Sequence, residues 1–238
     1  MLSNQQSADS SPGKSQDARS ARSQATCDKI IRVALKLFAD RGLEGVSLND
    51  INKAAGQRNK NATHYHFGSK DGLLQAILDR YEPRLAESRE AMLDEYESQG
   101  NLTTRNAVRA LLRPFAELIH DETGGRDFIR FNAHIIVNRT MIALNMAESG
   151  LQLVSVERLT KVLQSAATPL PPALQLQRGL MFGMLMTHSM AEHIKMMENL
   201  DDDVDWSVNT ELFLANLEDS LIALLETPPS EDTLAALP

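Results

Sequence analysis

Residues 47–70 read SLNDINKAAGQRNKNATHYHFGSK, and two short helices are predicted within them. The stretch opens on a capping box in which Ser47 is followed three residues later by Asp50, in place of the more usual Glu. The helix that this box predicts ends at Gly56, and its apolar positions are Leu48, Ile51, Ala54 and Ala55. A further short helix is predicted over about residues 60–66. Two short helices joined through a glycine have the dimensions of a helix-turn-helix, whose second helix can enter a DNA major groove.

The second helix carries side chains that can bond to base edges or phosphates. Thr63 and Phe67 lie four residues apart and are predicted to face a small helical core. The residues predicted to point outward are Lys60, Asn61 and His64, with Tyr65 and His66 beside them. Lys70, at the start of the next helix, is placed to meet a phosphate. A helix face that is only solvated shows the same pattern, so this alternative stays open.

The rest of the chain also follows helical spacing, with no alternating strand pattern and no repeat, so the predicted class is all-α. A first helix is expected from a cap at Thr26 to Arg41, and a fourth from Ser69, which Pro83 kinks or interrupts. The later helices are expected over 101–120 with a bend at Pro114, 126–146, 152–165, 173–199 and 206–226. We expect a flexible arm over 1–25, a helix-turn-helix domain over 26–70, a helical domain over 71–227 and a flexible tail over 228–238.

Composition limits the class of protein. The 238 residues are 42% hydrophobic, enough to fill a core, and Cys27 alone can form neither an intramolecular disulfide nor a thiolate zinc site. No run is long enough for a membrane span and no signal peptide is evident, so a soluble, cytoplasmic protein is expected. The net charge of −8 is unevenly spread, because residues 1–80 are net basic and residues 81–238 strongly acidic. A basic N-terminal third can dock on DNA while the acidic remainder faces away.

Three segments in order carry a wider pattern: ALKLFADRG at 34–42, SLNDINKAAG at 47–56 and YHFGSKDGLL at 65–74. Together they resemble the N-terminal DNA-binding domain of the TetR family of transcriptional regulators, over about residues 26–80. The resemblance implies an all-helical homodimer whose N-terminal domains bind a palindromic operator in double-stranded DNA. It also implies a C-terminal domain that binds a small molecule and then releases the DNA, as in a repressor.

By position in the family pattern, Ser47 is expected to anchor its helix at a phosphate and Lys70 to contact the phosphate backbone. Tyr65 is expected either to touch that backbone or to pack. The resemblance places a larger set on the DNA side of the helix-turn-helix or in its turn, and this set is Arg58, Asn59, Lys60, Asn61, Ala62, His64 and His66.

Beyond residue 80 the most informative segment is 179–197, a helix that is apolar on nearly every side and must be buried all round. It can line a ligand cavity, pack against a second copy, or belong to ordinary core, and Gly179 and Gly183 would permit close helix approach. The candidate residues for a small, largely apolar effector are His120, Arg130, His134, Phe182 and Met186. The candidates for the dimer contact are Met190, His193, Ile194, Met197, Phe213, Leu217 and Leu221.

Catalytic motifs are missing from the sequence: it holds no Gly-rich phosphate loop, serine elbow or His-Glu zinc motif, and Cys27 has no evident base beside it. We therefore expect no enzyme activity, no metal and no cofactor. Two rival functions remain, a DNA-binding dimer without a ligand and a helical small-molecule-binding module without a DNA partner. The acidic isoelectric point near 5.3 favours the second of these.

Overall fold

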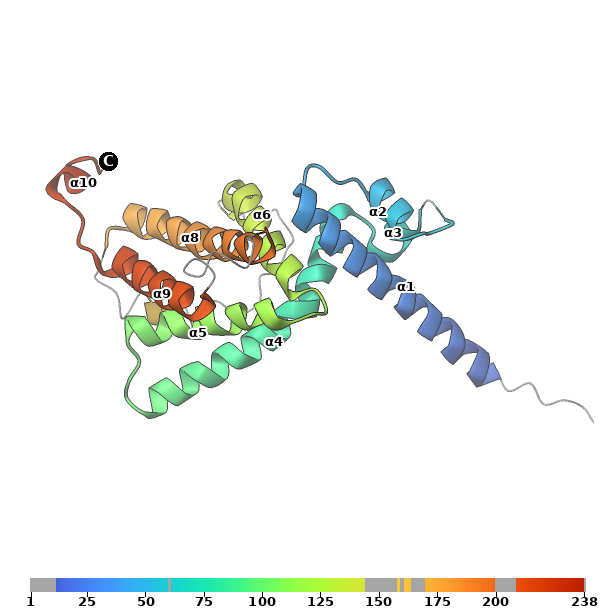
Figure 1. Cartoon of the computed structure of the whole chain (residues 1–238), viewed down its shortest axis with the longest axis horizontal. Helices are drawn as coiled ribbons and strands as arrows, with labels where there is room; N and C mark the ends of the chain where they lie inside the picture. Colours follow the sequence, from blue (N-terminus) through green and yellow to red (C-terminus); the bar gives the residue numbers. More distant parts are fainter. Residues whose placement is uncertain are drawn as a thin grey trace, which may run out of the picture.

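The computed structural model describes residues 12–59, 61–143, 158, 161–163, 170–199 and 209–237. Within these ranges every regular element is a helix, which confirms the all-α class (Figure 1). The elements are α1 (Pro12–Arg41), α2 (Leu48–Ala54), α3 (Ala62–Phe67), α4 (Lys70–Ser98), α5 (Thr104–Glu117), the 3-10 helix η1 (Leu118–His120), α6 (Gly125–Ala143), α8 (Pro172–Asn199), α9 (Thr210–Glu226) and α10 (Glu231–Ala235).

The helices form two parts with a continuous core. Figure 1 shows α2 and α3 beside α1 at one end of the molecule and α5, α8 and α9 at the other. Aromatic rings connect the two parts: Phe38 of α1 lies 6.2 Å from Phe131 of α6, and Tyr81 of α4 stacks on Phe128 of α6 at 4.2 Å, between ring centroids. Because these rings are in contact, a displacement of α6 would also shift α1 and α4, the two helices that pack against α2 and α3.

Two expected boundaries are wrong. The first helix does not begin at Thr26 but at Pro12, so residues 12–25 form a helix rather than the expected flexible arm. Thr26 is an interior residue whose hydroxyl donates to the carbonyl of Arg22, one turn earlier, at 2.9 Å. At the other end, part of the expected flexible tail forms α10, where the hydroxyl of Ser230 caps the helix by accepting from the N–H of Thr233.

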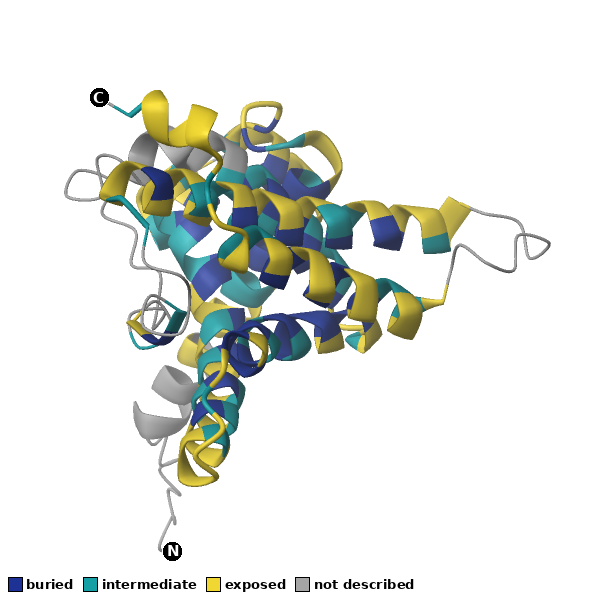
Figure 2. Cartoon of the chain, turned by 90° about the vertical axis from the view of Figure 1, so that its left-hand side faces the viewer, coloured by how far each residue is buried: buried dark blue, intermediate teal, exposed yellow. Residues whose placement is uncertain are grey.

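The later helices follow the expected order. The fourth is not interrupted, because α4 continues through Pro83, and α5 likewise contains Pro114. The expected helix over 152–165 lies largely outside the described residues, and so does Trp206 at the start of the last one. In Figure 2 the buried residues gather on the inner faces of the helices and the exposed ones on the outer faces.

The apolar helix α8 packs between α6 and α9. A Cβ on Gly183 would lie 3.0 Å from the Cδ1 of Ile136 in α6, which confirms the expected close helix approach at this glycine. The side chains that face inward here include most of the predicted dimer contacts, namely Met190, His193, Ile194, Leu217 and Leu221. These side chains are already buried within the single chain, so in this structure they offer no exposed surface to a second copy.

The two remaining dimer candidates also make contacts within the chain. Phe213 stacks on the ring of His193 with centroids 4.1 Å apart, and His193 lies within hydrogen-bond distance of the hydroxyl of Thr210, at 3.0 Å. The same hydroxyl contacts the sulfur of Met197. Burial lowers the pKa of His193, so the imidazole is held neutral between α8 and α9.

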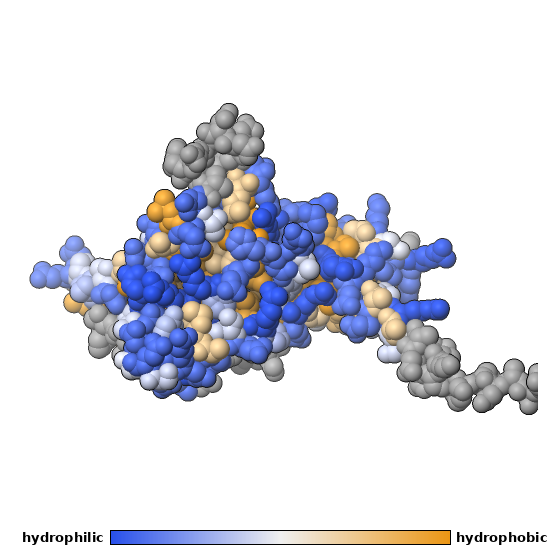
Figure 3. Space-filling model, turned by 60° about the horizontal axis from the view of Figure 1, so that its bottom comes forward, coloured by the Kyte–Doolittle hydropathy of each residue, from blue (hydrophilic) through white to orange (hydrophobic). Residues whose placement is uncertain are grey.

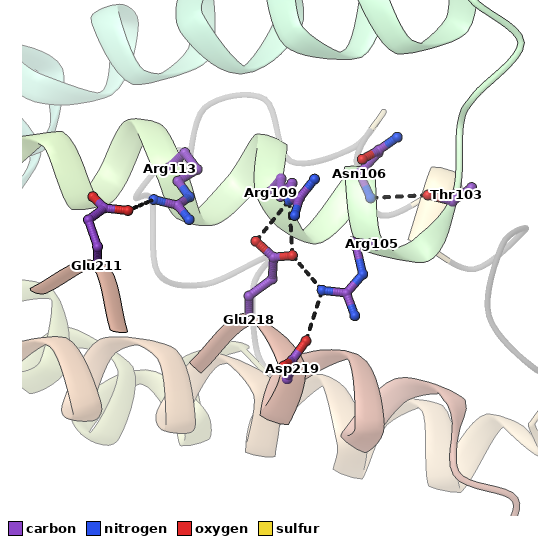
Figure 4. A network of polar contacts seen from close by, with 8 residues as sticks. All are labelled: Thr103, Arg105, Asn106, Arg109, Arg113, Glu211, Glu218 and Asp219. Carbon is purple, nitrogen blue, oxygen red and sulfur yellow. Dashed lines mark hydrogen bonds and ion pairs between the residues drawn. The ribbon is translucent and has the colours of Figure 1, made fainter. Parts of the chain in front are cut away.

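A ladder of ion pairs fastens α9 to α5 (Figure 4). The carboxylate of Glu218 is 2% exposed and accepts from Arg105 at 2.7 Å and from Arg109 at 2.9 Å. One turn further along α5, Arg113 pairs with Glu211 at 3.0 Å. Because the buried carboxylate is fully bonded while both arginines keep contact with water, the ladder positions α9 with little desolvation of its cations.

We expect Glu218→Gln to lower the free energy of unfolding by about 1–3 kcal/mol, because it replaces a charge-assisted acceptor by an amide that turns a donor toward the arginines. Urea denaturation of the purified protein measures this change. The matched control is Asp219→Asn, whose carboxylate pairs with Arg105 but is 66% exposed, so the change should stay below about 0.5 kcal/mol. Equal effects of the two variants would contradict the assignment of the buried carboxylate as the main connection.

Candidate DNA-binding surface

The capping box predicted at the start of α2 is confirmed. The backbone N–H of Asp50 donates to the Ser47 hydroxyl at 3.2 Å, and the Asp50 carboxylate accepts from the Ser47 N–H at 3.0 Å and from its hydroxyl at 2.5 Å. These bonds lower the pKa of Asp50 and use both donors of Ser47. Ser47 is exposed at the surface, but its predicted contact with a phosphate would compete with this cap.

A buried hydrogen bond fixes α3 against α2. The side-chain oxygen of Asn52 accepts from both the backbone N–H of Thr63 at 3.0 Å and its hydroxyl at 2.7 Å. Both side chains are buried, Thr63 completely. The prediction that Thr63 faces the core is confirmed, whereas Asn52 was missed by the sequence reasoning. A polar residue one position after Ile51, on the buried side of a capped helix, was the signal that could have revealed it.

The turn between α2 and α3 is stabilised by hydrogen bonds among neighbouring residues of the chain. Gly56 has φ +64°, the left-handed region that favours glycine, and its N–H donates to the carbonyl of Lys53. The Asn59 side-chain oxygen accepts from the N–H of Asn61 at 3.0 Å, just before α3 begins. Arg58 and Asn61 are exposed, as a DNA contact requires, and Lys60 lies outside the described residues.

The outward face of α3 carries His64 and Tyr65. Tyr65 is 80% exposed, so of the two roles expected for it packing is excluded, and a large aromatic side chain stands free on the surface. Ala62 is only 6% exposed because it faces the helical core, so its placement on the DNA side was wrong. Phe67, as expected, packs against the core. A free aromatic and an imidazole on one short helix can bond to bases or phosphates.

The last polar residue of α3, His66, points toward α1. Its Nδ1 lies 3.3 Å from the sulfur of Cys27, and its ring meets that of Tyr65 edge-on at 5.1 Å. Burial raises the pKa of the Cys27 thiol, and the neighbouring Asp28 carboxylate acts in the same direction. The contact between this protonated thiol and the imidazole joins α3 to α1. It engages the Nδ1 atom of His66, so only the other ring nitrogen remains for a DNA contact.

Lys70 makes structural contacts within the N-terminal part of the molecule. Its ammonium donates to the carbonyl of Leu43 at 2.5 Å and lies 5.8 Å from the centroid of the Phe38 ring. These contacts hold α4 against the loop that follows α1. An ammonium has three N–H donors, so a phosphate contact remains compatible with the bond to Leu43.

The predicted effector residues do not come together. Phe182 and Met186 are part of the core, and the Nε2 of His134 lies 3.3 Å from the carbonyl of Ala39 in α1. His120 and Arg130 do share a site, an open cleft of about 500 Å³ beside η1 and the first turns of α6. Its lining is charged rather than apolar, and includes Asp121, Glu122, Arg126, Asp127 and Glu198.

The guanidinium of Arg130 is held inside this cleft. It donates to Glu198 at 2.5 Å and to Asp127 at 2.7 Å, while its Nε is buried and has no hydrogen-bond partner among the described residues. The wall formed by His120, Asp121 and Glu122 also borders a second cleft next to α4. Arg84 of α4 reaches Asp121 at 3.4 Å. The cleft of Arg130 thus lies between η1, the start of α6 and the end of α8, and α4 borders the second cleft on the other side of the shared wall.

The described part of the chain contains no group of three or more His, Cys, Asp or Glu side chains arranged to hold a metal ion. None of its helices combines the length and the apolar character that crossing a membrane needs.

The segment that carries this surface matches a known family. Residues 30–77 match the family described as bacterial regulatory proteins, tetR family. Over 67 residues the chain is 43% identical to the "HTH-type transcriptional repressor ComR" of Escherichia coli (strain K12), covering 28% of this chain and 31% of that protein. Over 181 residues it is 25% identical to the "Probable HTH-type transcriptional regulator YttP" of Bacillus subtilis (strain 168), covering 72% and 83%.

Solved structures are similar at a lower level. The TetR family transcriptional regulator PfmR from Thermus thermophilus shares 21% identity with this chain, with a TM-score of 0.40 over 84% of this chain and 99% of that one. The family match is more specific, since it falls on the segment in which Asn52 and Thr63 join two helices around a tight turn. Residues 30–77 accordingly carry a DNA-binding helix-turn-helix of the kind found in the tetR family of bacterial regulatory proteins.

Proposed function

We propose that this regulator is a homodimeric repressor that binds a palindromic operator and leaves it when a small molecule binds. The observation that carries the proposal is the exposed polar face of α3 held in one orientation by the buried Asn52–Thr63 contact. Because α3 is already held in one orientation, the entropy cost of ordering it on binding DNA is small. We place its action in the cytoplasm, where a bacterial operator is found.

The dimer contact that we propose uses the outer face of α8 rather than the inner one. Met181, Met184 and Leu185 are spaced three and four residues apart on this helix and are exposed in the single chain. Leu212 at the start of α9 is also exposed. Large apolar side chains gathered on one helix face favour burial against a second copy, and a two-fold contact would give the dimer two equivalent α3 helices.

For the effector we propose the charged cleft next to Arg130, and therefore a polar ligand in place of the apolar one expected. A ligand that displaces Glu198 or Asp127 from Arg130 also gains the unpartnered Nε. The bond that Arg84 donates to Asp121 and the packing of Phe128 on Tyr81 then transmit the change to α4. A 100-fold release of DNA requires about 2.7 kcal/mol of preference between two dimer conformations, of which DNA selects the one with α3 helices about 34–36 Å apart.

Two substitutions separate base reading from phosphate binding. We expect His64→Ala to relax sequence preference with little change in salt dependence, and Lys70→Ala to weaken binding to all sequences and lower the salt slope by about one per protomer, or about two for the dimer. Lys70→Ala should also cost about 1 kcal/mol of stability, since Leu43 loses a donor. Titration of a labelled duplex at several salt concentrations, well below the melting temperature, measures both. Unchanged preference and slope would show that the assignment of these two residues is wrong.

The experiment that tests the proposed function is selection from random duplexes at near-physiological salt, followed by sequencing of the retained DNA. We expect an enriched palindrome with two half-sites one helical turn apart. Enrichment of a single half-site would contradict the dimer, and no enrichment by a folded protein would contradict sequence-specific DNA binding. The selected duplex then serves as the probe for compounds that release it.

A further inference from the structure

Helix α1 extends well beyond the domain that it helps to build. Cys27 contacts α3 and Asp28 forms an ion pair with Arg80 of α4 at 3.0 Å, which places this level of α1 beside the recognition helix. Residues 12–26 continue the helix past that level for about 22 Å, at 1.5 Å per residue. Figure 1 shows this part of α1 projecting from the end of the molecule opposite α8 and α9.

The composition of the extension decides which partner it fits. Residues 12–26 read PGKSQDARSARSQAT, with three basic residues, one acidic residue and no large apolar side chain. Residues 20–25 are all exposed. A segment of this composition cannot dock in a hydrophobic groove or form a coiled coil, whereas its basic residues suit a polyanion.

The basic character continues onto the helix-turn-helix. Lys29 is exposed, and its ammonium lies 3.7 Å from where a Cβ would stand on Gly56, so it covers the turn between α2 and α3. Arg22, two turns earlier on the same face of α1, is exposed as well. In Figure 3 long hydrophilic side chains protrude at the end of the molecule where the chain begins. Arg22 and Lys29 therefore place positive charge along α1 from the extension to the turn that precedes α3.

We propose that residues 12–26 of α1 lie along the DNA outside the half-site read by α3 and contact flanking phosphates through Arg19 and Arg22. The inference rests on the proposed function, because it needs an operator to flank. A solvated helix without tertiary contacts is marginally stable, so phosphate contacts also supply the partner that keeps this part of α1 helical. The extension adds affinity and salt dependence without adding sequence preference.

The test compares two duplexes, the minimal selected operator and the same operator with about ten extra base pairs on each side. We expect the wild-type dimer to bind the longer duplex more tightly and with a salt slope steeper by up to about four, for the four arginines of a dimer. Arg19→Gln/Arg22→Gln should lose this gain and keep the affinity and sequence preference on the minimal operator. The matched control is Ser20→Ala/Ser23→Ala, which changes the same exposed segment without changing its charge.

The outcomes are distinct. A double arginine variant that keeps the wild-type slope on the longer duplex overturns the inference and leaves the proposed function standing. An equal loss on both duplexes overturns the placement outside the half-site. If the wild-type protein selects no duplex at all, the proposed function itself fails.

Discussion

Asn52→Ala is expected to lower the free energy of unfolding by about 2–4 kcal/mol and to abolish sequence-specific DNA binding. The substitution removes the oxygen to which the N–H and the hydroxyl of Thr63 donate, and both groups then stay buried without it. The penalty for two unsatisfied donors exceeds the small loss of side-chain volume. Since α3 is only six residues long, it has little helical stability of its own once this contact is gone.

Two further variants make the Asn52 prediction specific. Thr63→Val keeps the backbone N–H bond and removes only the hydroxyl, so it should cost about 1 kcal/mol. Asn49→Ala, on the exposed side of α2, should leave stability and DNA binding near wild type. Thermal and urea unfolding, together with binding to the selected duplex, measure all three. An Asn52→Ala protein that melts and binds like the parent would show that other contacts orient α3.

Met181→Glu/Leu185→Glu is expected to convert the proposed dimer into folded monomers and to weaken operator binding at least 100-fold. In the single chain these side chains are 54% and 37% exposed, so two carboxylates there should hardly affect the stability of the monomer. In a dimer contact they would be buried unpaired, at a cost larger than the contact supplies. Loss of the second half-site removes the avidity of two linked reading helices, which accounts for the drop in affinity.

Light scattering gives the oligomeric state of this variant, and duplex titration gives its affinity. The control Ala91→Glu adds a carboxylate to an exposed position of α4 and should remain a dimer. Leu221→Glu tests the inner face, where the residue is fully buried, and should unfold the chain instead of dissociating it. A Met181→Glu/Leu185→Glu protein that stays dimeric would move the contact away from this face of α8.

The sequence predicted best what short-range rules govern. The Ser47–Asp50 box and the glycine end of α2 were predicted because their geometry depends on a few neighbouring residues. The sequence predicted less well which helices pack against each other, because that depends on residues far apart in the chain. Met190, Ile194 and Leu221 were assigned to a partner, yet apolar periodicity cannot tell a neighbouring helix of the same chain from one of a second copy.

Paired polar groups were also beyond the sequence reasoning. Asn52 and Thr63 are eleven positions apart, and Glu218 meets Arg109 across more than a hundred. Nothing local marks such residues as partners, because their side chains meet only when the helices have packed. The predicted start of α1 was wrong for another reason. Low apolar content indicates a lack of regular structure in an isolated segment, but a helix whose second half is buried can continue outward into solvent.

The contact between Cys27 and His66 places a cysteine beside α3, where a spin label can report the distance between two protomers. The sequence holds a single cysteine, so a nitroxide attached to its sulfur labels each protomer once, directly beside the recognition helix. In a dimer, the dipolar coupling between two such labels reports the separation of the two α3 helices in solution. The spectrum should be recorded without ligand, with operator, and with a compound that releases the operator. It would show whether release increases the distance between the two α3 helices, decreases it, or only broadens its distribution.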